Sequence, residues 1–135
     1  NAVNLASRLE GVNKQYGTWI LASEDTVKET GDHLLYRRLD RVRVVGINEP
    51  VRLCNLLETA ENALPEQKKM VEVFHHALDC FEERDWKHAA EGFREALSLS
   101  TEEQGPPQKY IERCEAFLKE PPPDSWDGVY NLTEK

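Results

Sequence analysis

Hydrophobic and polar positions alternate between helical and strand spacing along the first part of the chain. Residues 1–14 carry an apolar stripe at helical spacing, made up of Leu5, Leu9 and Val12. Residues 18–23 form a short apolar run rich in strand formers, which predicts a buried strand. Ser23 and the acidic residues after it favour the start of a short helix, which we expect to stop at Gly31.

Three further segments have the composition of strands. They are residues 34–39, 42–45 and 51–57, and the last two predict a hairpin across the turn-forming residues 46–50. The expected order is therefore helix, strand, helix, strand, strand, strand. This order is half of an α+β sandwich, and a sheet of this kind needs more strands.

The pattern changes to helical spacing after a polar stretch at residues 58–65, which we interpret as a linker. The periodicity predicts helices at residues 66–84, 86–99 and 107–120. Three consecutive prolines then exclude a helix, and two aromatic residues follow them. We therefore expect the tail to dock against the preceding helices.

The helical part resembles a tetratricopeptide unit, in which small and aromatic residues alternate where two antiparallel helices pack. The residues at those positions are Ala77, Trp86, Ala89, Phe93 and Ala96. Only one such unit and a following helix are visible, whereas arrays of this type need about three repeats for independent stability. The unit is thus expected to pack against the first part of the chain or against a second chain.

Charge separates the same two parts. Residues 1–57 have a net charge of +1, and residues 58–135 have a net charge of −9. Nucleic acid and anionic membrane surfaces are poor partners for the acidic part, because both repel it. Three widely spaced cysteines favour a reducing compartment, so we expect a cytoplasmic location and no direct membrane contact.

The first ten residues (NAVNLASRLE) resemble the V-N-x-A-S-R helix motif of class III adenylate and guanylate cyclases. Residues 16–23 resemble the next strand of that family, and the match continues to Leu57. The resemblance covers about the last third of the catalytic domain. It implies a partial ferredoxin-like cyclase sheet with helices at residues 1–57, the linker at 58–65, and an all-α tetratricopeptide-like extension at 66–135.

Asn4 and Arg8 are the candidate catalytic residues. Their i, i+4 spacing places both side chains on one helix face, where they can act on one nucleotide. In the family that the motif resembles, the asparagine orients the ribose, and the arginine stabilises charge as the 3′-hydroxyl attacks the α-phosphate. The alternative is a solvated helix face, but the neighbouring motif residues favour the catalytic interpretation.

One segment departs from the family pattern. The family usually has V-K-G-K before E-P-V, and a lysine there holds nucleotide phosphates, whereas this chain has Val45 and Ile47 at the lysine positions. Arg43 lies two residues before Val45, and so on the same strand face, where it could supply a charge. Arginine and lysine are not equivalent, however. Arg43 is therefore the candidate phosphate-binding residue of a weakened or specialised cyclase.

The resemblance also defines what lies elsewhere. The family's metal-binding aspartates and base-selecting residues precede this sequence, so the fragment is expected to be inactive, with no metal site of its own. The intact parent would bind ATP or GTP with Mg²⁺ or Mn²⁺, and it would form a homodimer because the family's sites lie between two catalytic domains. Adenylate is favoured over guanylate only by the frequency of the two activities in the family.

Both ends of the sequence add expectations. The helical pattern is already running at Asn1, which indicates a truncated chain. Residues 110–115, 121–123 and 126–129 resemble the extension of bacterial cyclases that carry an extracytoplasmic sensor and membrane helices. By this resemblance the parent is membrane-anchored, with this portion on the cytoplasmic side.

Two functions remain open from the residues alone. The first is that the chain is part of a purine nucleotide cyclase, which Asn4 and Arg8 favour. Alternatively, it is a non-catalytic interaction or dimerisation module attached to a degenerate cyclase domain, which Val45 and Ile47 favour.

Overall fold

The computed structural model describes residues 21–29, 31–44, 49–100 and 105–132. The chain divides into two compact units. The first comprises Asn1–Glu61 and Gly128–Lys135, and the second comprises Asn62–Asp127. The second unit is thus an insertion between two segments of the first.

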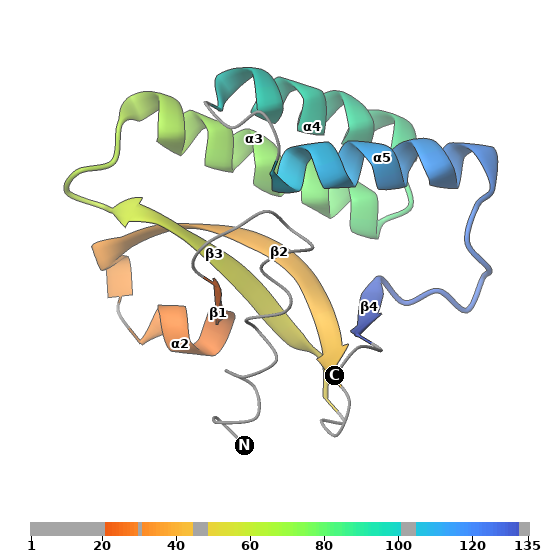
Figure 1. The fold of residues 1–135 in the computed structure, drawn as a ribbon, viewed down its shortest axis with the longest axis horizontal. Coiled ribbons are helices and arrows are strands. Elements are labelled where there is room, and N and C mark those ends of the chain that lie inside the picture. The colour runs from red at the N-terminus through yellow and green to blue at the C-terminus, as the bar shows by residue number, and fades with distance from the viewer. Residues whose placement is uncertain (1–20, 30, 45–48, 101–104, 133–135) are drawn as a thin grey trace. The chain divides into compact units, whose positions relative to one another are not determined.

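The first unit contains a four-stranded sheet (Figure 1). Its elements are β1 (Leu21–Ser23), α2 (Glu24–Lys28), a 3₁₀ turn η1 (Gly31–His33), β2 (Leu34–Val44), β3 (Val51–Thr59) and β4 (Val129–Leu132). The strand order is β1-β3-β2-β4. Strand β3 is antiparallel to both of its neighbours, and β4 is parallel to β2.

The predicted hairpin is confirmed, but the two strands expected at residues 34–39 and 42–45 are one strand, β2. The register explains the difference. Arg38 lies opposite Cys54, and Arg41 lies opposite Arg52. Between these two pairs, β2 therefore contains one residue more than β3. An extra residue of this kind is a β-bulge, which lets a strand continue through an irregular stretch.

Strand β4 was not predicted from the sequence, which assigned residues 128–135 to the helical extension. These residues cluster with the sheet unit, and Val129 lies opposite Arg41 on β2. A strand of four residues directly after a proline-rich stretch has too few alternating apolar and polar positions to be recognised as a strand from the sequence. Gly128 introduces it with a φ of 78°, a backbone conformation that glycine adopts without steric cost.

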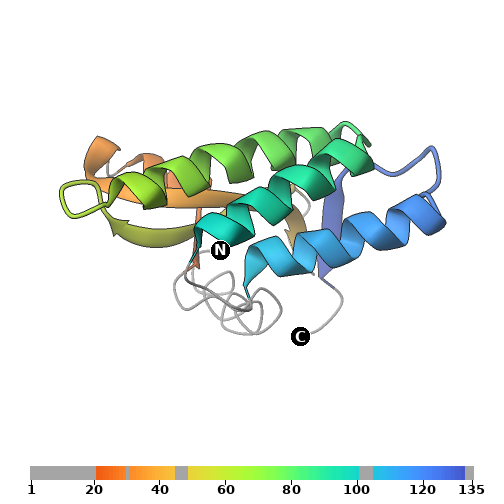
Figure 2. The same ribbon diagram turned by 90° about the horizontal axis from the view of Figure 1, so that it is seen from above.

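The second unit consists of three helices, α3 (Pro65–Glu82), α4 (Trp86–Leu99) and α5 (Pro106–Lys119), which lie side by side (Figures 1 and 2). All three predicted helices are confirmed to within two residues at each end. Prolines begin α3 and α5, where a missing backbone N–H costs no helical hydrogen bond. Asp85 caps α4 by accepting a hydrogen bond from the His88 backbone N–H at 3.3 Å.

Aromatic rings form the core of the helical unit. Phe81 lies at its centre, with five other rings within 6.3 Å between centroids: Trp86, Phe93, Tyr110, Phe117 and Trp126. The five residues of the small and aromatic pattern are all buried, as their packing roles require. The likeness to a tetratricopeptide unit itself stays a prediction.

The turn between α3 and α4 contains Arg84, which has a φ of 69°. Its N–H donates to the carbonyl of Phe81 at 3.1 Å, and the Asp85 N–H donates to the carbonyl of Cys80 at 2.9 Å. This pair of bonds closes a helix on a left-handed residue, a position that glycine usually occupies. An arginine therefore stands here at a backbone cost.

The mixed α and β architecture is confirmed, whereas the ferredoxin-like arrangement stays a prediction. None of the helices in the described ranges is long and apolar enough to cross a bilayer.

Candidate functional site

The two candidate catalytic residues, Asn4 and Arg8, lie outside the described residues, as do Val45 and Ile47. Their roles therefore stay predictions. Arg43 is described: it is half-buried near the end of β2 and lies opposite Asn131 of β4.

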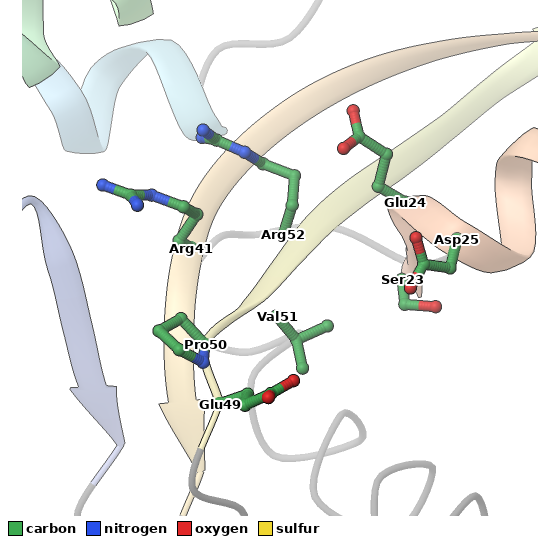
Figure 3. Close-up of a pocket in the computed structure, with 8 residues that line it drawn as sticks. All are labelled: Ser23, Glu24, Asp25, Arg41, Glu49, Pro50, Val51 and Arg52. Carbon is green, nitrogen blue, oxygen red and sulfur yellow. The ribbon is translucent and has the colours of Figure 1, made fainter.

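A cavity of about 430 Å³ opens in the sheet unit near the β2–β3 turn (Figure 3). Its lining residues come from β1, α2, β2, the two residues before β3 and the start of β3: Ser23, Glu24, Asp25, Arg41, Glu49, Pro50, Val51 and Arg52. Arg43 is not among them. Because side chains alternate along a strand, Arg43 nevertheless shares a sheet face with Arg41.

Two arginines sit side by side on this sheet. Arg41 and Arg52 are direct cross-strand partners, and Figure 3 shows both guanidinium groups extending in the same direction. The Nη1 of Arg52 donates to the backbone carbonyl of Leu39 at 2.8 Å, which fixes its side chain along β2. Like charges directly opposite each other on neighbouring strands are destabilising on their own. The same cavity is also lined by the carboxylates of Glu24, Asp25 and Glu49.

The opposite side of the cavity is acidic and is shaped by the start of α2. The Ser23 hydroxyl accepts a hydrogen bond from the Thr26 backbone N–H at 3.3 Å, so Ser23 caps the helix as predicted. Glu24 and Asp25 occupy the first turn, where the helix dipole favours negative charge. Glu24 also forms an ion pair of 3.7 Å with Lys28.

A buried thiol lies on β3 beside this region. Burial raises the pKa of Cys54 to about 12, the Glu24 carboxylate adds to the rise, and Arg52 and Arg38 oppose it. The thiol is therefore protonated at neutral pH and is a poor nucleophile. The Ser23 hydroxyl is engaged in the helix cap. Neither the Cys54 thiol nor the Ser23 hydroxyl is therefore set up as a nucleophile in this structure.

The described part of the chain contains no group of three His, Cys, Asp or Glu side chains placed to hold a metal ion. The ligands of the Mg²⁺ or Mn²⁺ that the cyclase resemblance implies are expected outside this sequence, and that expectation stays a prediction.

Sequence reasoning missed the Arg41 and Arg52 pair. The sequence predicted the hairpin of residues 42–45 with residues 51–57, but not the observed register, in which Val42 lies opposite Val51. The next pair outward is then Arg41 with Arg52. Only the register was lacking, and a strand pattern alone does not define it.

Comparison with known proteins points to one enzyme class. The chain is 27% identical, over 123 residues and 88% of its length, to the terminal-differentiation specific adenylate cyclase of Dictyostelium discoideum. It is 46% identical over 46 residues, 34% of its length, to adenylate cyclase 1 of Rhizobium meliloti (strain 1021). No protein-family profile matches the chain, and no solved structure matches it.

The chain spans 6% and 7% of the lengths of these two relatives. The longer match covers more residues than either unit holds, so it includes parts of the sheet unit and of the helical unit. The chain is therefore similar to part of an adenylate cyclase over most of its length, and the similarity is not confined to the sheet.

Proposed function

We propose that this chain is the C-terminal part of a class III adenylate cyclase catalytic domain, followed by a tetratricopeptide-like helical extension. The intact parent would convert ATP to cyclic AMP and pyrophosphate as a homodimer. The observation that carries the proposal is the match of 88% of the chain to an adenylate cyclase. The motif around Asn4 and Arg8 supports it.

The proposed chemistry assigns one task to each residue. The Asn4 amide hydrogen-bonds the ribose and orients its 3′-hydroxyl toward the α-phosphate. The Arg8 guanidinium faces the oxygens on which negative charge grows as that hydroxyl attacks and pyrophosphate leaves. A charge that acts mainly in the transition state raises the rate more than it raises substrate affinity.

Arg43 has a different proposed task. In place of the lysines replaced by Val45 and Ile47, it contributes positive charge to the nucleotide phosphates, which are charged before and during the reaction. Removal of Arg43 should therefore raise KM more than it lowers kcat.

The test measures cyclic nucleotide formation by the intact parent with ATP and with GTP, in the presence of Mn²⁺. Arg8→Ala should lower kcat with ATP roughly 10²–10³-fold, the range for loss of one preorganised charge at a reacting centre. Arg94→Ala is the matched control, because Arg94 is an exposed arginine on α4. It should leave both kinetic constants unchanged.

A different result would change the assignment. An intact parent that is silent with both nucleotides would indicate a degenerate cyclase site. The helical unit would then be the functional part, as an interaction or dimerisation module. A parent that prefers GTP would keep the cyclase assignment and overturn the adenylate one.

A further inference from the structure

The segment that joins α5 to β4, residues 121–127, is held by a set of contacts that neither the cyclase chemistry nor the sheet requires. We call it the strap. It follows three helices and leads directly, through Gly128, into a strand that pairs with β2. The strap is thus the last part of the helical unit before the chain rejoins the sheet.

Arg84 holds the backbone of the strap. Its Nη2 donates to the carbonyl of Pro123 at 2.6 Å and to that of Trp126 at 3.4 Å, and its Nη1 donates to the carbonyl of Pro122 at 3.4 Å. A run of prolines has carbonyl acceptors but no N–H groups for a strand or helix ladder. A guanidinium with several donors in a fixed fork suits such a segment.

Trp126 holds the strap through its side chain. Its ring lies 5.3 Å from the ring of Trp86, 5.8 Å from that of Phe81 and 5.8 Å from that of Phe117, measured between centroids. The Arg84 guanidinium carbon lies 5.4 Å from the centre of the same ring, at a distance suited to a cation–π contact. One arginine therefore binds both the backbone and the aromatic anchor of the strap.

The backbone of Arg84 is evidence that this contact is specific. Arg84 occupies a left-handed position that glycine would fill without strain. The helix turn alone gives no reason for an arginine there. The contacts of the Arg84 side chain with the strap explain why an arginine occupies this position.

The strand beyond the strap is weakly held by itself. β4 has four residues, pairs only with β2 among the described strands, and is joined in parallel. A short strand keeps its pairing when its tether confines it near its partner, because confinement raises its effective concentration. With the strap fixed, Gly128 is the whole free tether, whereas an unfixed strap would leave the nine residues 120–128 between α5 and β4 loose.

We propose that Arg84 and Trp126 form a latch on the strap, and that the latch determines whether β4 stays paired with β2. The helical unit can then change the sheet edge beside Arg41 and Arg43 without any change in the sheet's own residues. This device is independent of whether the parent is a cyclase.

The test is hydrogen exchange of the backbone amides in the full-length protein that carries this chain. Arg84→Gly removes the guanidinium and fits the left-handed turn, and Trp126→Ala removes the aromatic anchor. In both variants, exchange at the backbone amide of residue 126, which donates to the Pro123 carbonyl at 2.9 Å, and at β4 should rise by about tenfold or more, in keeping with the loss of confinement. The amides of α3 and β3 should keep their protection. Arg94→Ala, which removes an arginine outside the strap, should change none of these rates.

Three results would overturn the proposal. The strap amide could stay protected in Arg84→Gly, so that Arg84 is no latch. The strap could lose protection while β4 keeps it, so that the two are not coupled. Finally, β3 and β4 could lose protection equally, so that the variants destabilise the protein as a whole. Because Arg84→Gly relieves backbone strain, it is expected to fold, and its unfolding midpoint measured alongside separates the last case from the others.

Discussion

A Cβ atom placed on Gly92 of α4 would lie 2.7 Å from the Cβ of Ala77 on α3. The Ala77 methyl group therefore occupies the space beside Gly92, and a side chain at position 92 would push the two helices apart. Helix propensity alone would favour alanine over Gly92 by about 1 kcal/mol. The contact with Ala77 opposes that preference.

Gly92→Ala should destabilise the protein, because overpacking of a close helix contact costs about 1–3 kcal/mol, more than the gain in propensity. Urea denaturation measures the change in the free energy of unfolding. Ala77→Gly combined with Gly92→Ala moves the methyl group to the other helix and should recover part of the loss. A single Gly92→Ala variant as stable as the parent would show that the helices separate freely.

Phe81→Ala should cost about 3–5 kcal/mol, since a fully buried ring at the centre of an aromatic cluster leaves a cavity that its neighbours cannot close. The matched control is Phe117→Ala, because Phe117 belongs to the same cluster but is only half-buried. Its loss should be clearly smaller. Thermal or urea unfolding compares the two, and equal losses would contradict the central place given to Phe81.

The cysteines should differ in reactivity toward an alkylating reagent at pH 8. Burial raises the pKa of Cys54 and of Cys114 to about 12, so both thiols stay protonated at that pH. Burial also raises the pKa of Cys80, but its side chain is only half-buried. Mass spectrometry should find Cys80 labelled first in the native protein, with the other two labelled only on unfolding. Rapid native labelling of Cys114 would contradict its burial.

The same thiols make stability fall at high pH. An unfolded cysteine releases its proton above about pH 9, whereas Cys54 and Cys114 keep theirs in the folded protein up to about pH 12. Stability contributed by the protonated thiols is therefore full below pH 9 and declines as the pH rises above it. Cys114→Ala should flatten the decline in the unfolding free energy, and an unchanged slope would contradict the link.

Among the described carboxyl groups, Asp85 has a lowered pKa. Burial tends to raise the pKa of this carboxyl, but the hydrogen bonds from the His88 side chain and backbone N–H, with the charges of His88 and Lys87, outweigh it and lower the pKa below 3.8. The contribution of Asp85 is thus present above pH 3.8 and is lost as the pH falls through its folded value.

Asp85→Asn should make acid unfolding less steep, because an amide keeps the cap acceptor and has no charge to lose. Urea unfolding from about pH 6 down to about pH 2 measures the effect. Glu91→Gln, which changes an exposed carboxylate on the same helix, is the control. An equal effect of both changes would mean that net charge, rather than the cap, is responsible.

The helices were predictable because each has a sharp local boundary. Pro65 and Pro106 stand at helix starts, and Asp85 supplies a cap that the sequence displays directly. The apolar stripes of α3 and α4 also match their buried faces, as Phe74 and Phe93 show. Local signals of this kind need no knowledge of distant residues.

The sheet was harder to predict because its decisive features are not local. The bulge in β2 follows from the pairing of Arg41 with Arg52 on the neighbouring strand. Strand β4 exists because Val129 pairs with Arg41, and the sequence of the whole helical unit lies between these two residues. Register and long-range pairing are set by the partner strand, which a pattern along one segment does not contain. The role of Arg84 as a strap contact was equally hidden, since nothing in a turn sequence marks a left-handed arginine.

The parallel pairing of β2 with β4 fixes an order of events during synthesis on the ribosome. The hairpin of β2 and β3 can close as soon as it emerges, but residue 129, which pairs with residue 41, is translated 88 positions later. At about 5–20 residues per second this interval lasts roughly 4–18 seconds. Throughout it, the nascent β2 lacks the partner that the described strands give it on that edge, and an unpaired edge can pair with another strand. The risk that β2 pairs with a wrong strand is therefore greatest during synthesis, and it falls once β4 has been translated and has paired with β2.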